Sequence, residues 1–297
     1  MPNPRFEGSG VALVTPFDNV GVNERVLREL VAFHIAEGTD ALIICGSTGE
    51  AATMSPDEQR TAVEIAVDAS KGRLPIVAGC GGSDTKQVGR LAGQAREAGA
   101  DAILISAPPY NKPTQAGIVA HVRHVMDQAD LPAILYNVPS RAGVNMLPAT
   151  IEEMAQDKRV IGVKEACGDI SQIAQLAHRV GDTLDIWSGN DDQTVAVMAL
   201  GGKGIISVMG NVIPRKTSEM AKAFLKGDTA GARALQLEFL PLYAALFAEA
   251  NPIPVKAALT WLGFNVGEPR LPLMPITPAV REKLLAALSD AGLKPRR

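Results

Sequence analysis

The sequence contains little cysteine. Its 297 residues include only Cys45, Cys80 and Cys167, which are far apart and lie outside any C-x-x-C motif. An odd number of cysteines at such spacing predicts neither a disulfide framework nor a structural zinc site. Each cysteine follows an apolar run, so we expect all three to fill small spaces in the core, with a catalytic thiol as the less favoured alternative.

Long apolar runs and an excess of charge of one sign are also missing. The net charge is -3, which provides no basic surface for nucleic acid. No stretch approaches the roughly 20 apolar residues that a membrane span needs. Residues 1–5 lack the apolar core of a signal peptide. We therefore expect a cytoplasmic protein without a membrane or nucleic-acid partner.

Metal ligands are sparse. The four histidines are His34, His121, His124 and His178, and all fall in segments with helical periodicity. We expect His121 and His124, which share a helix face, to be surface polar residues. No set of side chains converges as a metal site requires. The sequence therefore predicts neither a metal nor a cofactor, and it argues against metal-dependent hydrolases and aldolases.

Short apolar runs rich in β-branched residues recur along the chain. Runs of this kind are typical of buried strands. Between them lie Ala- and Glu-rich segments with helical periodicity, such as residues 24–37, 56–70, 84–98 and 169–180. The runs are Val11–Val14, Ala41–Ile44, Pro75–Ala78, Ala102–Ile105, Ala133–Tyr136, Val160–Lys164, Leu184–Trp187 and Gly204–Val208.

Alternation of eight such strands with helices predicts an α/β fold. Each helix would connect two parallel strands, and eight units are typical of a closed (β/α)8 or TIM barrel. An open doubly wound sheet is the alternative, but no G-x-G-x-x-G motif follows the first run. We expect the barrel, with the active site, to occupy residues 1–224.

The pattern changes after the eighth run. Helical periodicity continues without another strand, at residues 220–226, 230–248, 254–262 and 278–291. We therefore expect a C-terminal helical extension over residues 225–297, packed against the barrel or against a partner subunit.

A lysine ends the sixth apolar run. In Val160–Lys164, strand alternation places Gly162 and Lys164 on one face and Ile161 and Val163 on the other. The glycine beneath the lysine leaves room for its stem and for an adduct. Burial penalises the ammonium form, and a neutral amine is a nucleophile toward carbonyl groups. The alternative is a solvated lysine at a strand end, which is the common environment of this residue.

Other polar residues follow the strands, where barrel enzymes carry their chemistry. The loop Gly46–Gly49 has the character of an anion cradle, or else is an ordinary tight turn. Tyr136 shares a strand face with Ile134 and can relay a proton, or it packs in the core. Arg141 can bind a carboxylate, or it forms a surface salt bridge. Together with Lys164, these residues predict a Schiff-base aldolase or lyase that uses a small 2-oxo acid.

At these positions the sequence resembles the pyruvate-dependent Schiff-base aldolase family, and within it the dihydrodipicolinate synthase branch. The resemblance covers nearly the whole chain. It implies a lyase that condenses pyruvate with L-aspartate 4-semialdehyde to 4-hydroxy-tetrahydrodipicolinate, in lysine and diaminopimelate biosynthesis. The motifs that carry the resemblance are Gly46–Glu50, Pro109–Pro113, Tyr136–Pro139, Gly162–Glu165, Gly204–Val208, Asn251–Lys256 and Arg270–Pro272.

The resemblance also implies catalytic roles. Lys164 would form the imine with pyruvate, and the resulting enamine would attack the aldehyde. Ser47 and Thr48, with backbone N–H groups of the loop that begins at Gly46, would hold the pyruvate carboxylate. Tyr136 would move protons with the help of Ser47, which stands where the family usually has threonine and keeps the hydroxyl.

Three further positions match the family. Tyr110 would reach the site from a neighbouring subunit, which requires at least a dimer, and the family implies a homotetramer built from tight dimers. Arg141 would receive the carboxylate of the semialdehyde. Ile206 matches a position whose backbone borders the substrate.

Two alternatives stay open within this resemblance. Lyases of N-acetylneuraminate and keto-deoxy sugar acids form the same imine, but they do not usually follow Tyr-Asn-Val-Pro with the pair found here, Ser140 and Arg141. A keto-acid-binding paralogue without turnover is the non-enzyme alternative. The presence of Lys164, Tyr136 and Arg141 argues against it.

The resemblance bears on inhibition by lysine as well. Feedback-controlled members usually hold lysine with histidines, an asparagine, a glutamate and a tyrosine. Few of the residues at matching positions here could hold its charged groups, so we expect weak or absent inhibition. The matching positions are Pro56, Gln59, Ser83, Gln87 and Pro109.

Overall fold

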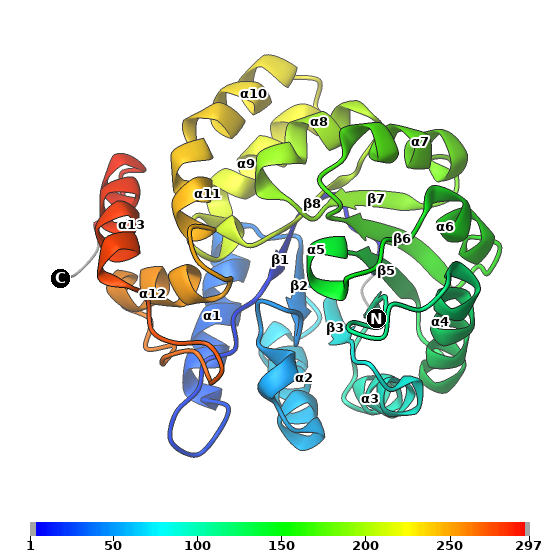
Figure 1. The fold of residues 1–297 in the computed structure, drawn as a ribbon. Coiled ribbons are helices and arrows are strands. Elements are labelled where there is room, and N and C mark those ends of the chain that lie inside the picture. The colour runs from blue at the N-terminus through cyan, green and yellow to red at the C-terminus, as the bar shows by residue number, and fades with distance from the viewer. Residues whose placement is uncertain (1–3, 295–297) are drawn as a thin grey trace.

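The computed structural model describes residues 4–294, and its centre is a closed barrel of eight parallel strands. The strands pair in sequence order, and β8 closes the barrel against β1. Figure 1 shows them in the middle of the molecule with the helices around them. The predicted (β/α)8 barrel is confirmed. The strands are β1 Gly8–Ala12, β2 Ala41–Ile44, β3 Ile76–Cys80, β4 Ala102–Ser106, β5 Ala133–Asn137, β6 Val160–Glu165, β7 Asp185–Ser188 and β8 Gly204–Ser207.

The outer layer follows the predicted helical segments closely because local signals define their ends. Helix α1 begins after Asn23, whose side chain accepts from the Val26 N–H, and ends at Gly38 with φ 81°. Helix α2 begins with a capping box between Ser55 and Glu58. The outer helices are α1 Glu24–Glu37, α2 Pro56–Ser70, α3 Thr85–Glu97, α4 Gln115–Ala129, α5 Pro139–Ala142, α6 Pro148–Met154, α7 Ile170–Val180, α8 Thr194–Ala199 and α9 Pro214–Leu225, with short 3-10 turns at Ala51–Thr53, Asp191–Gln193 and Met209–Asn211.

Further helices follow α9, and Figure 1 shows α11 to α13 along one side of the barrel. The single helix predicted over residues 230–248 is wrong, because the structure has two helices that meet at Phe239. Pro241 explains the break, since proline is disfavoured inside a helix but tolerated in the first turn, where it lies here. The domain boundary near residue 225 stays a prediction. The helices are α10 Thr229–Glu238, α11 Leu240–Leu246, α12 Ile253–Leu262 and α13 Pro278–Asp290.

Two residue clusters form the core. One lies between the strands and the helices, and the other fills the inside of the barrel. In the inner cluster the Trp187 ring stacks on Phe6 with 4.8 Å between centroids, and its indole N–H donates to the Phe6 carbonyl oxygen. The barrel is therefore filled by side chains below its carboxyl end, as is usual for this fold.

The predicted outward direction of Ile161 is wrong. Ile161 belongs to the inner cluster with Tyr136 and Trp187. The register between β5 and β6 shifts at this point, because Ala133 pairs with Val160 while the next residue of β5 pairs with Gly162. Such an irregularity inserts one residue on one strand and changes the direction of its side chain.

The first strand begins earlier than predicted, at Gly8 instead of Val11. Glycine is depleted in strands, so a prediction based on strand propensity misses the first residues of this strand. The structure needs glycine at position 10, since a Cβ there would lie 2.6 Å from the Phe6 ring. Close packing inside the barrel thus overrides the local preference.

The predicted surface position of His121 is wrong as well. His121 is 3% exposed between α3 and α4, and its Nδ1 lies 2.9 Å from the Thr85 hydroxyl. Burial lowers the pKa of His121 to about 4, helped by the charge of His124. The side chain is therefore a neutral part of the helix packing at neutral pH.

Two other predictions concern the chain as a whole. In the described part of the chain no helix is long and apolar enough to cross a membrane. Residues 1–3, on which part of the signal-peptide prediction rests, lie outside the described residues, as do residues 295–297 of the predicted helical extension.

Candidate active site

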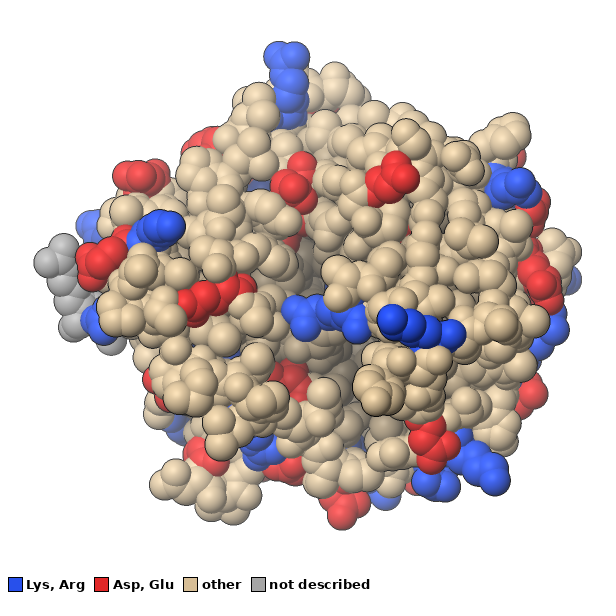
Figure 2. Space-filling view, in the orientation of Figure 1, with Lys and Arg blue, Asp and Glu red and all other residues tan. Residues whose placement is uncertain are grey.

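A cavity of about 270 Å³ lies at the carboxyl end of the barrel strands. Figure 2 shows that this face of the molecule is hollowed and that Lys and Arg side chains border the hollow. The end of a (β/α)8 barrel at which the strands meet their following loops is the usual place of the active site. The predicted site residues that line the cavity are Gly46, Ser47, Thr48, Tyr136, Arg141 and Lys164.

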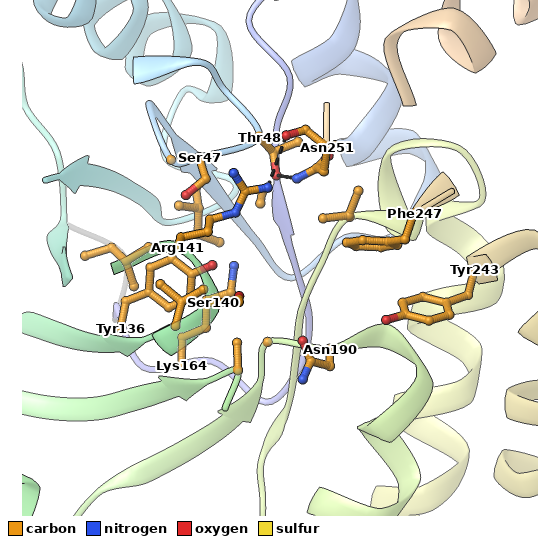
Figure 3. Close-up of a pocket in the computed structure, with 18 residues that line it drawn as sticks. Ser47, Thr48, Tyr136, Ser140, Arg141, Lys164, Asn190, Tyr243, Phe247 and Asn251 are labelled. Atoms are coloured by element: carbon orange, nitrogen blue, oxygen red, sulfur yellow. Dashed lines mark hydrogen bonds between the residues drawn. The ribbon is translucent and has the colours of Figure 1, made fainter. Parts of the chain in front are cut away.

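Lys164 and Tyr136 lie side by side in this cavity (Figure 3). They are direct partners in the register of β5 and β6, so their side chains point to the same face. Lys164 Nζ lies 4.4 Å from the centroid of the Tyr136 ring, and the two residues are 4% and 9% exposed. A primary amine and a phenol are thus held together at the floor of the site.

A glycine makes room for Lys164, but it is not the predicted one. A Cβ on Gly162 would lie 2.4 Å from the Trp187 ring, so this glycine accommodates the tryptophan. A Cβ on Gly189, just after β7, would lie 2.6 Å from Ala166 Cβ and 3.2 Å from Lys164 Cε. The space around the lysine stem therefore depends on Gly189, and the role predicted for Gly162 is wrong.

The residues that follow Tyr136 and Lys164 bind each other. Asn137 Nδ2 donates to both carboxylate oxygens of Glu165, at 3.0 and 3.1 Å, and the Cys167 N–H donates to Oε1 at 2.8 Å. Burial raises the pKa of Glu165, and these hydrogen bonds act in the opposite direction. The contacts hold the ends of β5 and β6 together, which fixes the amine and the phenol relative to each other.

The loop after β2 forms one wall of the cavity. Thr48 is 3% exposed, whereas Ser47 is exposed in the cavity. The turn is held by a hydrogen bond from the Glu50 N–H to the Ser47 carbonyl oxygen and by one from the Thr15 hydroxyl to the Gly49 carbonyl oxygen. Two hydroxyl-bearing residues therefore line the same cavity as Lys164, on a loop whose backbone is held by hydrogen bonds.

Arg141 lies at the mouth of the cavity, on α5, and Figure 3 shows it above Lys164 and Tyr136. Its Nη2 donates to the carbonyl oxygen of Asn251 at 3.1 Å. Arginine carries five N–H donors, so the others stay free for a ligand. An exposed cation at this place would favour a substrate that carries a carboxylate.

Tyr110 and Ile206 lie outside the cavity of this chain. Tyr110 is 89% exposed on the loop after β4, with φ 70°, a left-handed conformation that is uncommon for tyrosine. Ile206 is fully buried in the inner cluster. Val208, two residues further along, lines the cavity instead. The roles assigned to Tyr110 and Ile206 stay predictions.

Several cavity residues were not predicted as site residues. Asn190 follows β7, whereas Tyr243, Phe247 and Asn251 come from the C-terminal region. Burial, followed by the charges of Asp192 and Asp191, raises the pKa of Tyr243. Only Tyr243 of these three lies inside α11, which ends at Leu246, so no helical pattern in the sequence links them to the cavity.

A buried carboxyl group lies behind the cavity wall. Asp191 is fully buried and accepts from the N–H groups of Val208 (3.0 Å) and Met209 (3.2 Å) and from the Ser207 hydroxyl. Burial raises the pKa of Asp191, while these hydrogen bonds and the charge of Lys164 oppose the rise. Asp191 thereby joins the loop after β7 to the end of β8.

Within residues 4–294 no group of three or more histidine, cysteine, aspartate or glutamate side chains is placed to hold a metal ion. The site instead offers an amine, hydroxyls, an amide and a guanidinium. These groups suit a small anionic carbonyl compound, with the amine as nucleophile.

Comparisons with known proteins agree with this chemistry. The model of the dihydrodipicolinate synthetase family matches residues 5–291. A curated relative from Thermoanaerobacter sp. (strain X514) is named 4-hydroxy-tetrahydrodipicolinate synthase. It is 51% identical over 291 residues, which cover 98% of each chain.

Solved structures give the same result. Dihydrodipicolinate synthase from Aquifex aeolicus superposes with a TM-score of 0.96 and 39% identity, over 98% of this chain and 100% of the other. The enzyme from Thermotoga maritima has a TM-score of 0.95 and 39% identity, over 97% and 99%. A further match, also at 0.95 and 39% over 97% and 98%, is described as a monomeric dihydrodipicolinate synthase variant.

Proposed function

The chain belongs to the dihydrodipicolinate synthetase family, and we propose that it condenses pyruvate with L-aspartate 4-semialdehyde to form 4-hydroxy-tetrahydrodipicolinate. The family predicted from the sequence is confirmed, and the curated name of the relatives agrees with the predicted activity. The observation that carries the proposal is the buried amine of Lys164 beside the Tyr136 phenol, on the floor of a cavity lined with hydroxyls.

The first half of the reaction forms an enamine. Lys164 Nζ attacks the keto carbon of pyruvate, and loss of water leaves a protonated imine. A proton then leaves the pyruvate methyl group, and the electron pair moves toward the iminium nitrogen. Tyr136 is the proton carrier that the geometry supports, because its ring contacts the amine and its hydroxyl lies in the same cavity.

Two groups suit the two carboxylates. Ser47 and Thr48 line the cavity that holds the amine, and their hydroxyls can donate to the carboxylate of the bound keto acid. Arg141 at the mouth can bind the carboxylate of the incoming semialdehyde. The two anionic ends of the reactants are thereby kept apart while their reacting carbons meet over Lys164.

The second half joins the carbons and releases the enzyme. The enamine carbon bonds to the aldehyde carbon, whose oxygen takes up a proton. The amino group of the former semialdehyde then attacks the imine carbon and displaces Lys164 Nζ, which closes the ring. The lysine is regenerated, and the water lost during imine formation is the other product.

The predicted assembly rests on Tyr110. A tyrosine that is 89% exposed and held at φ 70° fits a residue that a second copy of the chain covers. The homotetramer implied by the resemblance is therefore part of this proposal. Sedimentation equilibrium tests it, since a monomer at enzymatic working concentrations would contradict it. The cytoplasmic location predicted from the sequence is likewise proposed.

Comparison of two activities tests the substrate. The protein should turn over pyruvate with L-aspartate 4-semialdehyde and should not cleave N-acetylneuraminate or keto-deoxy sugar acids. Arg141→Ala should raise the KM for the semialdehyde by at least about tenfold while leaving imine formation with pyruvate within about twofold. Cleavage of a sugar acid at a higher rate than condensation with the semialdehyde would contradict the proposal. If Arg141→Ala impaired imine formation as much as use of the semialdehyde, the role of Arg141 would be contradicted.

A further inference from the structure

Asn251 connects two walls of the cavity. Its side-chain Nδ2 donates to the Thr48 hydroxyl oxygen at 2.9 Å, and its main-chain carbonyl oxygen accepts from Arg141 Nη2 at 3.1 Å. Figure 3 marks both contacts with dashed lines. Thr48 follows β2 and Arg141 lies on α5 after β5, so one residue joins two loops that are far apart in the sequence.

The position of Asn251 is fixed by its surroundings. It is 6% exposed, lines the cavity and lies in the turn between α11 and α12, outside the eight strand–helix units. The nearby Lys256 is anchored by its ion pair with Glu50, two residues beyond Thr48. The C-terminal region is therefore attached to the loop after β2 through Asn251, Lys256 and Arg270, whose N–H donates to Glu50. Of these three residues, Asn251 also contacts Arg141.

The direction of the first hydrogen bond matters for chemistry. A threonine hydroxyl has one hydrogen to donate and two lone pairs that accept. Because Thr48 Oγ1 accepts from the Asn251 amide, its own hydrogen stays available for a ligand. The amide thereby keeps Thr48 as a donor toward an anion, which is the polarity that a carboxylate subsite needs.

The second contact acts on the guanidinium. A long arginine side chain at the surface loses considerable conformational entropy when it is held in one place. The carbonyl oxygen of Asn251 fixes one N–H of Arg141, and the remaining donors are free for a ligand. Holding the side chain before the substrate arrives lowers the cost of binding.

We propose that Asn251 is a positioning residue that sets the Thr48 hydroxyl and the Arg141 guanidinium for the two substrate carboxylates at once. The proposal rests on the proposed function and deepens it, because it makes the C-terminal region part of substrate recognition. Asn251 acts through the two side chains that it binds, and it needs no direct contact with the reacting atoms.

Asn251→Asp tests the proposal with little change of shape. The new carboxylate replaces the amide donor, so the Thr48 hydroxyl must donate to it and is lost as a donor to pyruvate. The same charge competes for Arg141. We expect the KM values for pyruvate and for the semialdehyde each to rise by about tenfold or more, with a smaller fall in kcat. Asn265→Asp is the matched control, since Asn265 is exposed in the same region and lies outside the cavity.

A double-variant cycle separates positioning from general damage. If Asn251 acts through Thr48, then Asn251→Asp should change the KM for pyruvate by less than about twofold in a Thr48→Val background. Asn251→Ala serves if the aspartate variant does not fold, as judged by circular dichroism. It removes the amide donor to Thr48 but keeps the main-chain carbonyl oxygen that binds Arg141, so it should raise the KM for pyruvate. Additive effects, or KM values within about twofold of the Asn265→Asp control, would overturn the proposal.

The proposed function is tested separately in the same series. Trapping of pyruvate on Lys164 by borohydride in the wild type supports the imine chemistry, whatever the Asn251 variants do. If the wild type traps pyruvate and turns over both substrates while the Asn251 variants keep control-like KM values, the inference about Asn251 fails alone. If the wild type does not trap pyruvate, the proposed function fails first.

Discussion

Replacement of Lys256 by methionine tests how the C-terminal region is fastened to the loop after β2. Lys256 Nζ lies 2.8 Å from Glu50 Oε1, and both side chains are 1% exposed. The ammonium also donates to the carbonyl oxygens of Thr15 (3.3 Å) and Glu268 (3.1 Å), and it lies 4.6 Å from the Phe17 ring centroid. Burial lowers the pKa of Lys256, while the bond to Glu50 opposes this.

The expected loss of stability follows from the buried groups that lose their partner in Lys256→Met. Methionine keeps much of the volume, but the Glu50 carboxylate stays buried with the Arg270 N–H (2.7 Å) as its remaining donor. Removing one partner of a buried ion pair costs about 3–5 kcal/mol. We expect the free energy of unfolding to fall by about 3–4 kcal/mol, or the melting temperature by roughly 6–8 °C.

Thermal unfolding followed by circular dichroism measures this change at a fixed protein concentration. Adding Glu50→Gln to Lys256→Met should recover at least about half of the loss, because glutamine is uncharged and still accepts the Arg270 N–H. Lys226→Met, at an exposed lysine, is the control. A Lys256→Met protein that melts within about 1 °C of wild type, or a double variant no more stable than the single one, would refute the reasoning.

Three further predictions address other parts of the molecule. Gly189→Ala should slow imine formation at least about tenfold, because the added methyl would lie 3.2 Å from Lys164 Cε; unchanged borohydride trapping would contradict this. Burial lowers the pKa of His34 from 6.5 to about 3. As the pH falls, the imidazole is therefore protonated in the unfolded chain before it is protonated in the folded protein, and stability is lost between pH 6.5 and 3. At pH 5 the loss is about 2 kcal/mol. Urea unfolding should therefore show that the free energy of unfolding of His34→Gln, relative to wild type, rises by about 2 kcal/mol between pH 7 and pH 5. A difference that stays constant over this range would contradict the prediction. Millimolar lysine should inhibit weakly or not at all, since the Gln59 and Ser83 side chains already donate to backbone carbonyl oxygens of this chain; clear inhibition in the coupled assay would disprove this.

The barrel was predictable because strand and helix signals repeat along the chain and agree with one another. The wrong predictions concern positions where packing determines the strand bounds or the direction of a side chain. Gly8 and Gly10 belong to the first strand despite their low strand propensity, since the Phe6 ring leaves no space for a side chain at position 10. Ile161 turns inward because the pairing of β5 with β6 shifts there, and register is not visible within one strand.

The candidate site was predictable where a residue ends a strand. Tyr136 and Lys164 could be placed in one cavity because parallel strands carry their carboxyl ends to the same side. Gly189 was missed because its contact with the Lys164 stem depends on the neighbouring strand. The contribution of the C-terminal region was missed for the same reason, since the path of the chain after α9 decides that Tyr243 and Asn251 reach the cavity.

Reduction of the protein with borohydride in the presence of pyruvate tests the central claim most directly. Intact mass spectrometry should show one reduced pyruvate per chain, and peptide mapping should place it on Lys164. Lys164→Ala should show no adduct and no condensation activity. Condensation activity without an adduct, or an adduct that maps to another lysine and persists in Lys164→Ala, would contradict the account.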